Sequence, residues 1–201
     1  MKTDVITVSS RGNRMDAALA QVDKVCAYKG LNGKNSLHLH LLAEEMMGMM
    51  RSITGETSGQ FWIEDEDDVY SLHLAVNTSM NSGKRDQLLS AATSGKNESA
   101  KGLMGRLRDF FDRESDEDVA ALSSSLLMPE MYDQFSSPTL EMEWTMARYE
   151  SGLASRVEQD DPAAKEAWDE LEKSVVAHVA DDVKVSIRGR SVEMIIIKKL
   201  A

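Results

Sequence analysis

Two adjacent carboxylates, Glu44 and Glu45, stand in the middle of an apolar segment and are the residues best placed to do chemistry. The segment, residues 36–54, carries an apolar stripe with helical spacing: Leu39, Leu42, Met46, Met49 and Ile53. Glu45 lies one turn before Met49, beside this stripe. A carboxylate at such a position is either partly covered and held for a purpose, as in general base catalysis, or solvated at the helix edge.

Other residue types that could do chemistry lack the required spacing. His38 and His40 point apart on a helix and cannot chelate one metal together. The acidic run 64–68 lacks the central glycine and distal glutamate of a calcium loop, which predicts a solvated hairpin turn. Lys96 lies in a polar loop, residues 93–99, without a phosphate-loop motif, although its amine could reach a phosphate there. We therefore expect no metal site.

Composition restricts the classes of protein that the chain can belong to. A formal net charge of −11 over 201 residues leaves no basic excess for nucleic acid, so we expect no nucleic-acid partner. The only cysteine, Cys26, excludes an internal disulfide and falls in an apolar helical pattern. No segment is apolar enough to cross a membrane, and the N-terminus carries no export sequence, so we expect a cytoplasmic protein without membrane contact.

Periodicity predicts an α+β fold. Strands are expected at residues 3–8, 59–64, 69–76, 182–188 and 191–198, and helices at residues 14–29 and 36–54. In 69–76, apolar residues alternate with polar ones, which is typical of a strand with one buried face. We predict a mixed, mainly antiparallel sheet with helices on one face, within a single domain that spans residues 1–201.

Residues 115–180 are predicted to form a helical insertion before the closing hairpin. Ser137-Pro138 and Asp161-Pro162 each place a capping residue before a proline at the first helical position, which predicts helices over 137–157 and 161–179. Apolar residues of the first helix point in several directions: Leu140, Met142, Trp144, Met146 and Tyr149. Such a helix must be covered on more than one face. We expect region 137–179 to bind a protein partner or a second copy; burial within the monomer is the alternative.

The element order resembles the histidine-kinase-like (GHKL) ATP-binding fold, above all the serine-kinase domains of bacterial anti-sigma factors. The resemblance covers about residues 1–113 and 181–201. Glu45 matches the acid that activates water or a substrate hydroxyl in that family, while Met49 stands where the family has the magnesium ligand Asn. Three residues stand at the key places of the adenine-binding Asp-x-Gly-x-Gly motif: Asn77, Ser79 and Asn81. Lys101 to Leu107 is similar to the second glycine motif through Gly102 and Gly105.

The resemblance implies a two-layer GHKL-like sandwich and a nucleotide site formed by Asn77, Ser79, Asn81 and the residues near the phosphates, Lys96, Gly102 and Gly105. A thioether is a poor ligand for magnesium, and the motif glycines are replaced. We therefore predict a degenerate ATP-binding domain that acts as a regulatory or protein-interaction module, with ATP or ADP bound weakly and without clear need for magnesium. The alternatives are an active serine/threonine kinase or ATPase with Glu45 as base, and a structural protein without a ligand.

Overall fold

The computed structural model describes residues 1–9, 15–54, 58–77, 142–188 and 191–200. Their elements are β1 (Ile6–Ser9), α1 (Met15–Lys29), α2 (Gly33–Thr54), β2 (Ser58–Glu66), β3 (Val69–Asn77), β4 (Met142–Thr145), α5 (Met146–Glu158), α6 (Pro162–Leu171), α7 (Val175–Val179), β5 (Asp182–Arg188) and β6 (Ser191–Lys199). The expected α+β class is confirmed. All five pairings among the described strands are antiparallel, so the predicted mixed sheet is wrong for this part of the chain.

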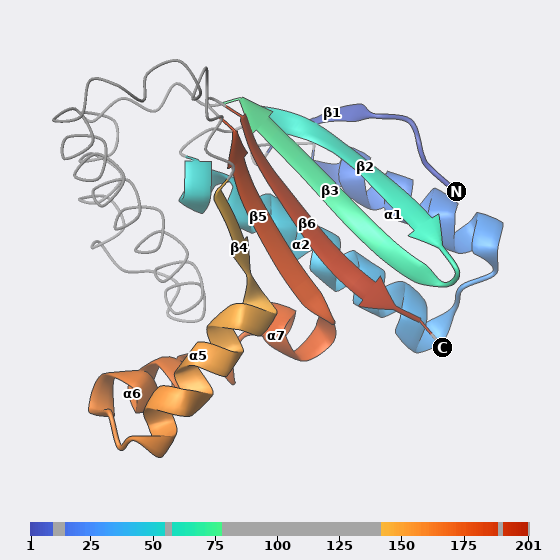
Figure 1. The fold of residues 1–201 in the computed structure, drawn as a ribbon. Coiled ribbons are helices and arrows are strands. Elements are labelled where there is room, and N and C mark those ends of the chain that lie inside the picture. The colour runs from blue at the N-terminus through green and yellow to red at the C-terminus, as the bar shows by residue number, and fades with distance from the viewer. Residues whose placement is uncertain (10–14, 55–57, 78–141, 189–190, 201) are drawn as a thin grey trace, which may run out of the picture.

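One six-stranded sheet, in the order β1-β2-β3-β6-β5-β4, joins the two ends of the chain. The predicted strands all belong to it, and β3 pairs with β6 along its whole length, from Val69↔Lys199 to Asn77↔Ser191. The closing hairpin therefore lies in the same sheet as residues 69–76, as predicted. In Figure 1 both chain termini lie at the same end of this sheet.

Helices α1 and α2 pack on one face of the sheet, behind the strands in Figure 1. The apolar stripe of α2 is buried from Leu39 to Met50, which confirms the predicted helix. Gly30 follows the last residue of α1 with a φ of +66°, which favours glycine, and the amide of Leu31 donates to the Cys26 carbonyl at 2.8 Å. This C-cap turns the chain back so that α2 lies beside α1.

Strand alternation divides the sheet into two faces. On the helix-facing side, strands β2 and β3 bury Phe61, Ile63, Leu72 and Leu74, as the predicted alternation requires. The opposite side, which we call the open face, contains Gln60, Trp62, Glu64, Ser71, His73, Glu193, Ile195 and Ile197. No helix of the described chain segments covers the open face in Figure 1. The hydrophobic core therefore lies mainly between the sheet and α1 and α2, and it continues into buried residues of α5, α6 and α7.

The predicted helix 137–157 is wrong over residues 142–145, which form the edge strand β4. β4 pairs with β5, and Trp144 lies opposite Val185 on the helix-facing side. Thr145 ends the strand and caps α5, because its hydroxyl accepts a hydrogen bond from the Arg148 amide at 3.3 Å. Local propensity did not predict this four-residue strand, because its partner β5 lies about 40 residues further along the chain.

The predicted helix 161–179 is two helices, α6 and α7, separated at residues 172–174. Asp161 accepts from the Ala164 amide at 3.4 Å, and Pro162 is the first residue of α6, so the predicted capping motif is confirmed. Ser174 caps α7 in the same way through the Ala177 amide. A second capping serine in the middle of the apolar pattern thus starts a new helix. Residues 115–141 of the predicted insertion lie outside the described residues.

Candidate functional site

Helix α2 presents Glu45 on its exposed side. The inward side of the same turns is fully buried through Leu42, Met46 and Met50, which fixes the rotation of the helix. Atoms packed around the Glu45 carboxyl exclude part of the solvent and raise its pKa, and the charge of Glu44 adds a smaller increase. A carboxyl group with a raised pKa is a better proton acceptor at neutral pH than an ordinary one.

Met49, the residue at the position of the family's magnesium ligand, belongs to the core. It lies one turn after Glu45 and is 5% exposed. A buried thioether has neither the hard oxygen nor the solvent access that magnesium requires. The described part of α2 therefore places the acid of the predicted site at the surface and directs the metal position inward.

Of the remaining predicted site residues, only Asn77 lies in the part of the chain that the structure describes. Asn77 is the exposed last residue of β3 and lies opposite Ser191 of β6. Ser79, Asn81, Lys96, Gly102 and Gly105 lie outside the described residues. Between the two members that are described, Glu45 and Asn77, no hydrogen bond is formed. The nucleotide site stays a prediction.

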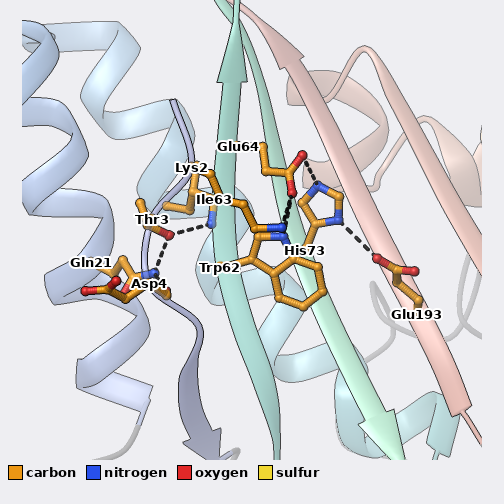
Figure 2. Close-up of polar contacts among 9 residues, drawn as sticks. All are labelled: Lys2, Thr3, Asp4, Gln21, Trp62, Ile63, Glu64, His73 and Glu193. Carbon is orange, nitrogen blue, oxygen red and sulfur yellow. Dashed lines mark hydrogen bonds and ion pairs between the residues drawn. The ribbon is translucent and has the colours of Figure 1, made fainter.

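A polar cluster on the open face was not predicted from the sequence (Figure 2). His73 stacks on the indole of Trp62, with ring centroids 4.7 Å apart and planes 11° from parallel. Its Nδ1 lies 3.1 Å from an oxygen of Glu193, and its Nε2 lies 3.8 Å from an oxygen of Glu64. The cluster joins β2, β3 and β6 and leaves His73 only 9% exposed. The alternation correctly placed His73 on the polar face; the pairing of β3 with the distant β6 buried it.

Glu64 is the most connected member of this cluster. It accepts a hydrogen bond from the Trp62 indole at 2.9 Å and pairs with the ammonium of Lys2 at 2.8 Å. The bond to Lys2 contributes most, and the indole bond next, to a lowered pKa of Glu64. His73 Nε2 has no hydrogen-bond partner and faces this carboxylate. The Lys2 and Trp62 bonds thus favour the ionised form of the Glu64 carboxylate beside the Trp62–His73 stack.

A second unpredicted group is the buried carboxylate of Asp65. The sequence predicted a solvated turn over 64–68, but only Asp67 and Asp68 form the turn, both with positive φ as two-residue hairpins favour. Asp65 faces the helices and pairs with Lys29 of α1. The bond to Asp65 raises the pKa of Lys29. The alternation that buries Phe61 and Ile63 also buries position 65, and this signal was available in the sequence.

Among the described residues, no group of three or more His, Cys, Asp or Glu side chains could hold a metal ion. His40 is engaged with the Ser36 carbonyl at 2.9 Å and with Asp23 at 2.8 Å. Within the same described ranges, no helix is both long enough and apolar enough to cross a bilayer.

A scan against protein-family models and searches of curated proteins and of solved structures found no match to this chain. The resemblance to histidine-kinase-like ATP-binding domains therefore stays a prediction that rests on the motif residues and the element order.

Proposed function

We propose that the chain is a degenerate histidine-kinase-like ATP-binding domain that acts as a regulatory or protein-interaction module. The order of strand, two helices, strand hairpin and closing hairpin supports this proposal, because it agrees with the order expected for that fold. So does the position of Glu45 on the exposed side of the second helix. Fold likeness alone does not fix an activity, so the proposal depends on the chemistry of the site.

The observation that carries the proposal is the burial of Met49. An enzyme that transfers phosphate needs a metal ligand near its catalytic acid, and the side chain one turn after Glu45 is a thioether packed in the core. A nucleotide could then be held only through its base, sugar and phosphates. We therefore expect weak binding of ATP or ADP that does not depend on magnesium.

Calorimetric titration with ATP, with and without magnesium, tests this proposal. We expect a dissociation constant weaker than about 10 μM, which is about −7 kcal/mol, and a change of less than threefold when magnesium is removed. A matched variant, Met49→Asn, should leave the magnesium response small if the position points into the core. Submicromolar binding that requires magnesium would contradict the proposal.

An active serine/threonine kinase or ATPase with Glu45 as base is the second candidate. The raised pKa of Glu45 favours it, because a general base works best when its pKa approaches the working pH. Glu45→Gln should then abolish ATP turnover, while Glu44→Gln on the adjacent exposed position should retain it. Turnover that survives Glu45→Gln, or that is absent from the wild-type chain, would reject this candidate.

Region 137–179 is proposed as the surface for a protein partner or a second copy. Helices α5 and α6 pack against each other beyond β4, at the corner of the molecule that Figure 1 shows at the lower left. Trp168 of α6 is half-buried, and its indole donates to Glu172 at 2.9 Å. Val175 of α7 is exposed. Trp168 and Val175, rather than the buried Trp144, are apolar groups of this region that a partner could cover.

A further inference from the structure

Gly48 is a glycine that the fold of α2 does not require. It lies in the middle of the helix, between the buried pairs Met46–Met47 and Met49–Met50, and is itself exposed. Its φ is not positive, unlike that of Gly30. A Cβ built at Gly48 would meet nothing within 4 Å. Neither backbone conformation nor packing within the described residues therefore explains a glycine at this position.

A glycine inside an exposed helix lowers stability, because it loses more backbone freedom on folding than alanine does. Gly59 shows the opposite case, since a Cβ there would meet the Ala75 carbonyl oxygen at 2.9 Å, so the packing of β2 on β3 requires it. Gly48 has no such reason within the described chain. It leaves the backbone of α2 bare toward solvent, where a group from outside the chain can approach it closely.

Glu44 and Glu45 border this bare backbone. Residues three and four positions apart are neighbours on a helix, so both exposed carboxylates flank Gly48. No Lys, Arg or His of the described residues forms an ion pair with either of them. Two uncompensated carboxylates repel a chain of phosphates, and Met49 offers no ligand for a metal that would bridge them. The uncharged part of a nucleotide suits this surface better, because carboxylates accept hydrogen bonds from ribose hydroxyls.

We propose that Gly48 is the contact point of the nucleotide on α2: the ribose lies on the bare backbone and donates its hydroxyls to Glu45, while the phosphates point away from Glu44 and Glu45. This inference rests on the proposed function and names the part of the ligand that this side of α2 recognises. The ligand class is a nucleoside with free 2′- and 3′-hydroxyls, and the triphosphate adds nothing to its binding here. A methyl group at position 48 would occupy the space of the sugar.

Gly48→Ala tests the contact because it improves the helix and at the same time fills the bare surface. We expect the urea midpoint of unfolding to rise and the affinity for adenosine, measured by calorimetry, to fall about tenfold. Gly152→Ala is the matched control. Gly152 is an exposed glycine within α5, where a Cβ would also meet nothing within 4 Å. The control should raise the urea midpoint in the same way and leave adenosine binding unchanged.

Three ligands, all without magnesium, separate the parts of the nucleotide. Adenosine should bind at least about threefold tighter than ATP at low salt, and the difference should shrink as salt is added, because salt screens the repulsion. Dideoxyadenosine, which lacks both ribose hydroxyls, should bind about tenfold weaker than adenosine, as expected for lost hydrogen bonds to a charged acceptor. Glu45→Gln removes one charge and should narrow the gap between adenosine and ATP.

The outcomes distinguish this inference from the proposed function. Binding of adenosine and ATP that Gly48→Ala does not weaken, or that Gly48→Ala and Gly152→Ala weaken alike, would overturn the contact and leave the proposed function intact. ATP that binds tighter than adenosine without magnesium would likewise overturn the assignment of the ribose. A wild-type chain that binds neither ligand would reject both the inference and the nucleotide binding on which it rests.

Discussion

The folded state disfavours the protonated, charged form of His38. Its Nδ1 is buried and has no hydrogen-bond partner. Burial lowers the pKa of His38, and the nearby positive charges of Lys198 and Lys34 lower it further, while Asp181 opposes them. The folded state therefore binds the proton less readily than the unfolded chain does. Folding stability should be fully present above the unfolded pKa of about 6.5 and should decline as the pH falls toward the lower folded pKa.

Replacement of His38 by Gln removes the titrating group and should flatten this decline. We expect the free energy of unfolding of His38→Gln to lose less between pH 7 and pH 5 than that of the wild-type chain, as urea denaturation at each pH would measure. His178→Gln, on an exposed position of α7, is the control and should follow the wild-type profile. Equal pH slopes for His38→Gln and the wild type would show that His38 does not titrate across folding.

At the scale of elements, the junction of β4 with α5 decides what region 137–179 can expose. Trp144, which the sequence placed on a multi-faced helix, is 4% exposed and lies 5.9 Å from the ring of Tyr149. Apolar residues that were counted on one helix are thus divided between an edge strand and a helix that both contact β5. In the described residues, packing within the chain therefore explains why these apolar side chains point in several directions.

A pair of substitutions separates packing from partner binding at this corner. Trp144→Glu should destabilise the chain by more than about 3 kcal/mol, since it removes a buried ring and buries a charge. Trp168→Glu, on half-buried Trp168 of α6, should cost about 1 kcal/mol or less and act mainly on association. Urea denaturation and sedimentation velocity measure the two effects. A Trp144→Glu chain as stable as the wild type would show that β4 is not part of the folded sheet in solution.

For the whole molecule, the pairing of β3 with β6 joins segments about 120 residues apart. Ile196 of β6 is fully buried and lies opposite Leu72. Ile196→Ala should cost about 2–5 kcal/mol, and because one core serves both ends of the chain, amide protection at Leu74 and Val185 should fall together. Ile195→Ala, on the half-buried open face, should cost less. Protection lost at only one of the two amides would divide the chain into separate folding units.

Local patterns in the sequence determined most elements of this protein. Period-2 alternation identified the strand that became β3, and the 3.6-residue stripe identified α2, because each pattern records which residues of one element must be buried. The Asp161-Pro162 cap also followed from the sequence, since a capping bond joins residues only three positions apart. Glu45 could be named as a candidate from its position at a helix edge, whereas Asn77 became a candidate only through the resemblance to the adenine-binding motif.

Contacts between distant segments were decided only by the tertiary structure. The burial of His73 between Trp62 and Glu193 depends on the register of three strands, and no residue near His73 in the sequence predicts Glu193. Residues 142–145 form strand β4 because they pair with the edge of β5. A four-residue segment has too little local preference to specify a strand without that partner. The inward direction of Met49, in contrast, was already predicted by the apolar stripe of residues 36–54, because helical spacing places it on the same side as Leu42 and Met46.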